Sequence, residues 1–194
     1  MKVLIITSLK VLLAFTVITG FFYPVIVTIL SQIVFPGQAN GSLIHNHQLI
    51  IGSKLIGQKF ESDRYFWSRP SAIDYQPLPS GGSNFSPTSQ KLKELYEQRK
   101  STFIQKNGLN RATKIPVEMV FASASGLDPH ISVRSAELQA ERIARARGFN
   151  ADERKKMLET INKFREGPSL FFGDESRVNV LLLNIELDKM FNKE

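Results

Sequence analysis

The sequence predicts an α+β protein in which one N-terminal transmembrane helix precedes a single small extracytoplasmic α+β domain. Residues 11–53 contain no Lys, Arg, Asp or Glu, and their first half is almost entirely apolar. After Lys54, apolar residues recur at helical spacing in several charged segments, which is typical of amphipathic helices. Short β-prone runs between Gly- and Pro-rich loops separate those segments, so strands and helices are expected to share one domain.

The apolar run from Val11 to Phe35 is longer than the roughly 20 residues that a helix needs to cross the hydrocarbon core of a bilayer. A signal peptide would have a shorter apolar region of about 7–15 residues, followed by a small-residue cleavage site. The sequence from Phe35 to Gln38 is a poor match to such a site. We therefore expect residues 11–35 to form an uncleaved transmembrane helix.

Two small residues in this run, Thr16 and Gly20, stand four positions apart and share one face of the expected helix. Small side chains let a second helix approach closely in lipid, so this face is a candidate for membrane-helix packing. The alternative is that both residues are merely tolerated facing lipid. Pro24 removes one backbone donor and is expected to kink the helix.

The flanking charges predict the orientation of the span. Lys2, Lys10 and the terminal amine precede it, whereas the first cation after it is Lys54. Because positive residues stay on the cytoplasmic side, residues 1–10 are expected in the cytoplasm and the main domain in the periplasm or its equivalent.

The remaining chain divides into a polar linker, residues 36–48, and one domain, residues 49–194. Residues 48–51 are expected to form a short strand, and the β-prone aromatic run Tyr65–Trp67 a second extended segment. Residues 74–88 contain three prolines and two glycines and should be irregular.

The helices of this domain are expected from their caps. Ser86 is a candidate N-cap with Pro87 at the first helical position, and this helix should end at Asn107-Gly108. Residues 117–122 resemble a strand entered through Pro116.

Three further segments complete the expected domain. Ser132 or Ser135 can cap a helix that lasts to Arg147 and is ended by Gly148, and a third helix should start near Asn150. Residues 178–191 are expected to be a helix, with a strand left open as an alternative.

The composition excludes several kinds of chemistry. The chain has no cysteine, so disulfides, thiolate metal sites and cysteine nucleophiles are ruled out. The motifs of P-loops, nucleophile elbows and phosphorylated P-type pumps are missing. His45 and His47 alternate and His130 is isolated, so we predict no metal site and no catalytic residues. The net charge of +7 is spread over mixed-sign segments, which favours a solvated surface over a nucleic-acid partner.

Two small-residue loops remain as candidate sites. The first, residues 80–84, could wrap an anion with its backbone amides, although a flexible turn or a protein-contact loop is favoured. The second, residues 123–132, admits either tight backbone packing or docking through its polar side chains. The candidate nucleotide or partner contacts are Gln58, Ser80, Gly81, Gly82, Ser83, Asn84, Ser125, Gly126, Asp128 and His130.

Six blocks of sequence carry a resemblance to a known family. They are GSKLIGQ (52–58), YFWSRPSA (65–72), SGGSNFSPT (80–88), SASGLDPHIS (123–132), AELQAERIARARG (136–148) and RVNVLLLNIELD (177–188). In this order after a single span, they closely resemble the KdpC family, one of the four kinds of chain in the Kdp high-affinity potassium-transporting ATPase. The resemblance covers nearly the whole chain.

The resemblance implies an accessory, non-catalytic subunit in the bacterial inner membrane, with membrane lipid around its span. Its implied partners are the channel-like KdpA, the P-type ATPase KdpB and the small KdpF, whose assembly it would stabilise. The family has also been described as a catalytic chaperone that raises the ATP affinity of KdpB. The chain would then have no cofactor of its own but would share ATP with the ATPase.

This last implication conflicts with the charge-based topology, which places residues 36–194 where ATP is scarce. We give the topology more weight. Two other classes stay open: a membrane-anchored periplasmic hydrolase that uses Ser125 and His130, and an anchored binding module.

Overall fold

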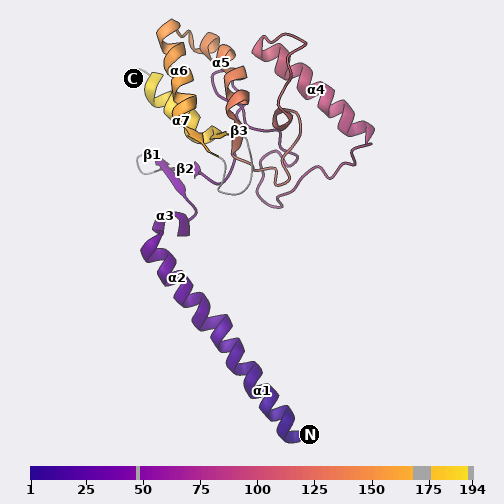
Figure 1. Ribbon diagram of the computed structural model, residues 1–194, viewed down its shortest axis with the longest axis vertical. Helices are drawn as coiled ribbons and strands as arrows, with labels where there is room; N and C mark the ends of the chain where they lie inside the picture. Colours follow the sequence, from indigo (N-terminus) through magenta and orange to yellow (C-terminus); the bar gives the residue numbers. More distant parts are fainter. Residues whose placement is uncertain (47–48, 168–175, 192–194) are drawn as a thin grey trace. The chain divides into compact units, whose positions relative to one another are not determined.

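The computed structural model describes residues 1–46, 49–167 and 176–191, so His47 and Gln48 lie outside the described residues. The chain divides into two units, Met1–Ile51 and Gly52–Glu194, and each is described by itself (Figure 1).

The first unit is dominated by a continuous apolar helix, Lys2–Val34, the one candidate membrane span in the described part of the chain. It consists of α1 (Lys2–Val17), a π-helical turn η1 (Ile18–Phe22) and α2 (Tyr23–Val34). Its length, about 50 Å at the usual rise per residue, exceeds the roughly 30 Å of a bilayer's hydrocarbon core. The helix begins at Lys2, upstream of the apolar run, because nothing between Lys2 and Lys10 breaks a helix.

The π-helical turn ends two residues before Pro24, which occupies the first turn of α2. The N–H of Tyr23 reaches back five residues to the carbonyl of Ile18. This wider turn accommodates a residue that has no N–H to donate, and it is a common response of helices to proline.

Residues 36–48, expected to be a linker, contain structure. A short helix α3 (Pro36–Ala39) is followed by strand β1 (Leu43–Asn46), which pairs with β2 (Leu49–Ser53). Gly41 and Ser42 both have positive φ angles, +83° and +50°, and the turn they form carries the chain from α3 into β1.

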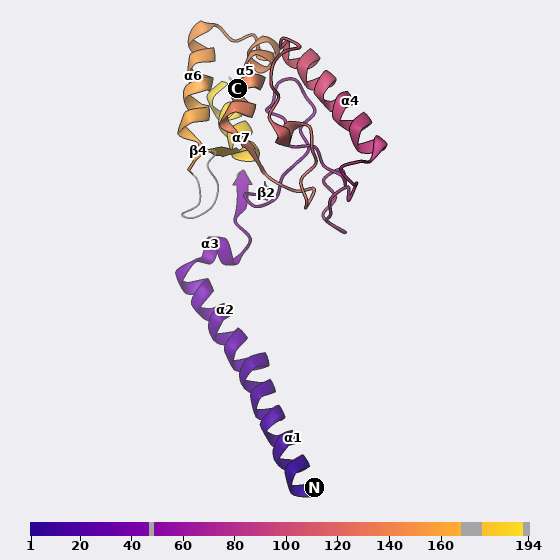
Figure 2. The same ribbon diagram turned by 45° about the vertical axis from the view of Figure 1, so that its right-hand side comes forward.

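The second unit is built on a small antiparallel sheet in the order β3-β5-β4. In it His130 pairs with Asn179 and Arg165 pairs with Val178. The central helix α5 contacts both α4 and α6, and α6 contacts α7 (Figures 1 and 2). The bounds are β3 (His130–Ser132), β4 (Arg165–Glu166), β5 (Arg177–Asn179), α4 (Gln90–Asn107), α5 (Val133–Arg147), α6 (Ala151–Lys163) and α7 (Val180–Phe191).

The core lies between these helices and the sheet. Ala136, Ala140 and Ala144, which stand four positions apart on α5, are all buried. Small side chains there let neighbouring elements pack closely. The large side chains that fill the core are Phe66, Ile131, Ile143, Met157, Ile161, Val178, Leu183 and Leu187.

Most of the predicted helix caps are confirmed. The Ser132 hydroxyl accepts from the N–H of Ser135, and Gly148 ends α5 with a left-handed φ of +69°. Asn150 begins α6 in a complete capping box with Glu153. For residues 178–191 the helix and the alternative strand are each confirmed in part, because β5 leads directly into α7.

The start of α4 was predicted wrongly. Ser86 instead forms a turn, in which its carbonyl accepts from the N–H of Ser89, and Ser89 is the N-cap of the helix. The helix ends at Asn107-Gly108 as expected, with Gly108 left-handed.

The strand predicted for residues 117–122 is also wrong, because Val117–Met119 form a short 3-10 helix, η2. The carboxylate of Glu118 accepts from the N–H of Ser132 and the hydroxyl of Ser135, at the start of α5. The 3-10 turn brings the carboxylate of Glu118 to these two donors.

The aromatic run Tyr65–Trp67 forms no strand, although its backbone is paired as if it did. The side-chain amide of Asn184 bonds both the N–H and the carbonyl of Phe66, at 2.8 and 3.0 Å. The amide of Gln139 does the same for Trp67, at 2.7 and 3.3 Å. Helical side chains therefore replace the missing partner strand.

Candidate functional site

The two candidate loops lie against each other and against the segment that contains Gln58. The N–H of Gly81 donates to the carbonyl of Ser125 at 3.1 Å, and the N–H of Gly57 donates to the carbonyl of Leu127 at 2.7 Å. Segments that are far apart in the sequence thus form one surface, which we call the loop cluster (residues 57–58, 80–84 and 123–130).

Close backbone approach explains the glycines of this cluster. A Cβ atom on Gly57 would lie 2.6 Å from the carbonyl oxygen of Asp128, and one on Gly82 would lie 3.2 Å from that of Ala124. Gly126 has a φ of +70°, and a Cβ there would lie 2.5 Å from Ile73. The amide of Gly81 is already used within the chain, so it is not directed at a ligand.

Asp128 anchors the charged side of the cluster. Its Oδ2 pairs with Arg69 at 2.6 Å, and its Oδ1 accepts from the N–H of His130 at 3.0 Å. Burial of the carboxyl opposes its ionisation, but the hydrogen bonds from His130 and Arg69 prevail and lower the pKa of Asp128 to about 2. Asp128 is therefore ionised at neutral pH and holds the loop to Arg69.

His130 connects this pair to the sheet. Its Nε2 lies 3.5 Å from the carboxylate of Glu166 in β4, and its Nδ1 lies 3.6 Å from Asp128. Glu166 in turn contacts Arg177 in β5 at 3.4 Å. Two carboxylates thus flank the imidazole of His130, and each of them also pairs with an arginine, which fixes the geometry.

The backbone of Arg69 is also held in place by a hydrogen bond. The hydroxyl of Tyr75 donates to the carbonyl of Arg69, and burial raises the pKa of Tyr75 to about 12, so the hydroxyl stays protonated. Within the described residues, the Nε of Arg69 is the one buried side-chain nitrogen or oxygen without a hydrogen-bond partner.

The other predicted residues lie at the edges of the cluster. The carbonyl of Gln58 accepts from the hydroxyl of Ser68 at 2.9 Å. Ser80, Asn84 and Ser125 are exposed, whereas Ser83 is half-buried. Asn84 has a left-handed φ of +51°, which Asn tolerates better than most residues.

The described residues do not bring Ser125, His130 and Asp74 together as a hydrolase triad. The Oγ of Ser125 accepts from the N–H of Leu127 at 3.1 Å, and in the described part of the chain no hydrogen bond joins it to His130. Asp74, a possible third member, pairs with Lys59 at 2.8 Å. The described residues also contain no group of three or more acidic or histidine side chains placed to hold a metal ion.

A pocket of about 530 Å³ lies beside the cluster, and sequence reasoning missed it. Its lining includes Trp67, Arg69, Tyr75 and, from α4, Arg99 and Phe103, but none of the candidate contact residues. Arg69 links the two features because it both lines the pocket and binds Asp128. The feature of the sequence that could have indicated this pocket is the block YFWSRP (65–70), in which a charged residue follows an aromatic run.

In the membrane helix, Thr16 and Gly20 have no partner outside their own helix in the first unit. The hydroxyl of Thr16 donates to the carbonyl of Leu12 at 2.8 Å. Gly20 lies in η1, where a Cβ would meet no atom within 4 Å. This face therefore has room for a neighbouring helix, and packing there stays a prediction.

Comparison with known proteins identifies relatives along nearly the whole chain. The profile of the KdpC family, described as the c chain of the K+-transporting ATPase, matches residues 5–189. The potassium-transporting ATPase KdpC subunit of Methylococcus capsulatus is 45% identical over 186 residues, covering 94% of this chain and 96% of the relative.

Two further relatives carry the same description. The KdpC subunit of Methylibium petroleiphilum is 45% identical over 191 residues, covering 97% of this chain and 98% of the relative. That of Sorangium cellulosum is 43% identical over 184 residues, with coverage of 93% and 95%.

Proposed function

Because the chain belongs to the KdpC family, the c chains of K+-transporting ATPases, we propose that it is an accessory subunit that stabilises assembly of the potassium-conducting and ATP-hydrolysing subunits. The observation that carries this proposal is the match along residues 5–189. The chain also offers what an assembly subunit needs: a membrane helix with an open small-residue face, and a rigid loop cluster.

The loop cluster is the surface that we propose for docking to the potassium-conducting subunit. Its backbone is fixed by hydrogen bonds between the loops, while Ser80, Asn84 and Ser125 are exposed. Loops that a rigid scaffold positions commonly carry binding residues, and a preorganised surface loses little entropy on docking.

The proposed placement is a single pass through the bacterial inner membrane, with residues 1–10 in the cytoplasm and the second unit outside. Lys2 and Lys10 support it, as do the uncharged residues that follow them. On this placement, direct contact with ATP, which the family resemblance implies, is not expected.

The test is co-purification of the native complex with Ser80→Arg, which adds a bulky charge at an exposed position of the loop cluster. We expect a several-fold lower yield of the larger subunits, because the docked surface can no longer close. Ser101→Arg, on the exposed side of α4, makes the same change away from the cluster and should assemble normally. Equal yields from both variants would contradict docking through the cluster.

A second variant separates assembly from catalysis. Asp128→Asn removes the charge paired with Arg69 but retains an acceptor for the N–H of His130. In complex that assembles, we expect potassium-stimulated ATP hydrolysis to keep its apparent affinities. A several-fold shift in the apparent potassium affinity would contradict a purely structural role. A weaker apparent ATP affinity would instead support nucleotide contact.

A further inference from the structure

The positive charge of the domain is concentrated in one segment. Residues 90–114, which we call the basic segment, contain seven cations and only two carboxylates. The rest of the chain after residue 48 contains 16 of each. The net charge of the domain is therefore that of the basic segment, which comprises α4 and the loop after it. Its cations are Lys91, Lys93, Arg99, Lys100, Lys106, Arg111 and Lys114.

Ion pairs neutralise little of this charge in the described part of the chain. Among the described residues, the one ion pair of the basic segment joins Lys106 to Asp63 at 3.9 Å. Two cations of the neighbouring helices are paired more closely: Arg147 lies 2.6 Å from Asp188, and Arg154 lies 2.6 Å from Glu141. Arg99 alone of the seven is directed inward, to the carbonyl of Val120. The remaining five cations of the segment have no ion pair among the described residues, so they are available to a partner.

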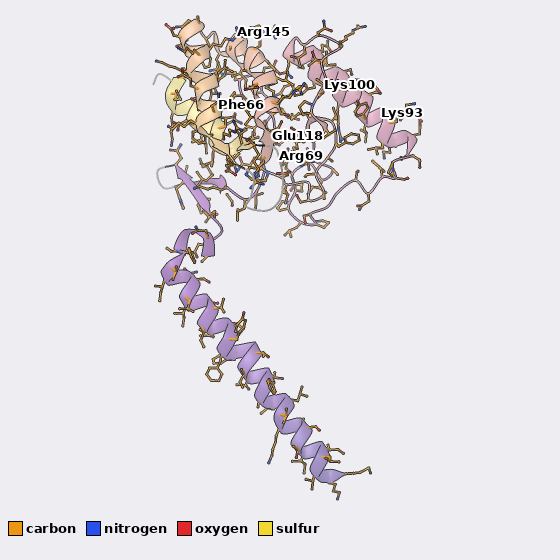
Figure 3. All side chains as sticks on the ribbon, in the orientation of Figure 1. Phe66, Arg69, Lys93, Lys100, Glu118 and Arg145 are labelled. Carbon is orange, nitrogen blue, oxygen red and sulfur yellow. The ribbon has the colours of Figure 1, made fainter. Side chains whose placement is uncertain are left out.

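The side chains of the basic segment are also of the types that occur in the headgroup region of membranes. Lys93 and Lys100 stand a near-integral number of turns apart on α4, and both can be followed in Figure 3. Lys100 lies over the ring of Tyr96 and Lys91 over that of Phe85, at 5.6 and 5.2 Å. Long basic side chains beside aromatic rings are typical of membrane–water interfaces.

We propose that the basic segment binds the anionic headgroups of the membrane in which the chain is anchored. The chain's own connectivity favours lipid over a free acidic protein. Only residues 35–51 separate the end of the candidate span at Val34 from the second unit, and such a segment reaches at most about 60 Å. Headgroups are therefore present at high effective concentration, and weak individual contacts suffice.

A second argument rests on the proposed function. If the basic segment lies near the pore of a potassium importer, its uncompensated cations would lower the local potassium concentration within about a Debye length of 8 Å. Binding the basic segment to anionic lipid neutralises these charges.

The test uses the full chain alone in nanodiscs, so that its outcome does not depend on the other subunits. The chain has no cysteine, so Ser101→Cys on α4 provides a single labelling site. Energy transfer from that label to a headgroup-labelled lipid should be higher in discs containing about 30% phosphatidylglycerol, a strongly anionic surface, than in phosphatidylcholine discs. It should fall to the neutral level as salt is raised.

Two variants with equal change in net charge make the test specific. Lys93→Gln/Arg111→Gln removes two cations of the basic segment, and Lys155→Gln/Lys156→Gln removes two exposed cations of α6. Energy transfer reports the ratio of chains whose basic segment is bound to the membrane to those whose segment is free. We expect Lys93→Gln/Arg111→Gln to lower this ratio by about 25-fold, since each cation near an anionic surface contributes about a fivefold preference. Lys155→Gln/Lys156→Gln should leave it unchanged.

Three outcomes would overturn the proposal. Equal transfer in neutral and anionic discs would exclude lipid recognition. Equal loss in both variants would show a general charge effect rather than a site. In a second measurement, with the larger subunits added, energy transfer that was low for the chain alone and now rises whatever the lipid would assign the basic segment to an acidic protein surface.

Discussion

Arg142 fixes the irregular segment that leads to the candidate site. Its guanidinium donates to the carbonyls of Asp63 and Tyr65, at 2.7 and 3.0 Å, and to the side chain of Asn107. It also stacks 3.9 Å from the ring centre of Trp67. Burial lowers the pKa of Arg142 to about 10, so it stays charged at neutral pH. The buried guanidinium thereby supplies hydrogen bonds to backbone carbonyls that would otherwise need a neighbouring strand as their partner.

Replacing this arginine should be costly to stability. Arg142→Met keeps much of the apolar stem but leaves several buried acceptors unpaired, so we expect a loss of about 3 kcal/mol in the free energy of unfolding. Arg145→Met is the matched control, because Arg145 is exposed on the same helix. Chemical unfolding of the full chain in micelles, followed by circular dichroism, measures both. Similar losses in the two variants would contradict the role of Arg142 in holding the backbone of Asp63 and Tyr65.

The pair of Asp128 with Arg69 predicts how stability depends on pH. The pKa of Asp128 falls from an ordinary value of 3.8 to about 2 on folding, so its contribution is present above pH 3.8 and is lost as the pH falls towards 2. The wild type should exceed Asp128→Asn by about 2 kcal/mol at pH 6 and by almost nothing near pH 2. Unfolding followed by the fluorescence of the single Trp67 measures the difference; a gap that stays constant with pH would assign the stability to packing instead.

Among the elements, helices whose ends are encoded locally were predictable and segments whose partners are remote were not. Ser132, Gly148 and Asn150 act on neighbours a few residues away, so the sequence displays them. The run Tyr65–Trp67 has the composition of a strand, and nothing near it shows that Gln139 and Asn184 supply its hydrogen bonds.

The candidate site divides in the same way. Glycine-rich loops marked residues 80–84 and 123–130, but Arg69, the residue that joins Asp128 to the adjacent pocket, was not singled out. Its partner lies 59 positions away in the chain. Ion pairs over such separations depend on the tertiary fold, which a single sequence does not display.

The packing of the two loops makes a prediction for their glycines. Gly57→Ala places a methyl group 2.6 Å from the backbone of Asp128, which cannot move aside cheaply, so we expect a loss of at least about 2 kcal/mol in stability. Gly81→Ala meets no atom within 4 Å and should be neutral. Thermal unfolding of both full-length variants checks the contrast. Equal destabilisation would mean that the loops do not pack as described.

At the scale of the whole molecule, the distribution of charge connects topology to function. Two cations, Lys2 and Lys10, lie in the first part of the candidate span and no charge follows in it, and a domain whose excess charge lies in one basic segment comes after. The positive charge of the long second unit does not oppose its translocation, because the preference of cations for the cytoplasmic side applies to residues near the span. If the domain lies outside, the proposed chaperone role in ATP binding cannot act through direct contact, and an assembly role remains.

The absence of native cysteine allows the orientation to be measured directly. In intact spheroplasts, a membrane-impermeant maleimide should label Ser101→Cys, because α4 then faces the outside. Ser8→Cys, between Lys2 and Lys10, should react only after the membrane is permeabilised, since those cations hold the N-terminus in the cytoplasm. The reverse pattern would place the second unit with ATP in the cytoplasm and restore nucleotide contact as the role of the loop cluster. Labelling of Ser101→Cys in both conditions, with Ser8→Cys protected until permeabilisation, would instead support an assembly subunit that acts from the outer face.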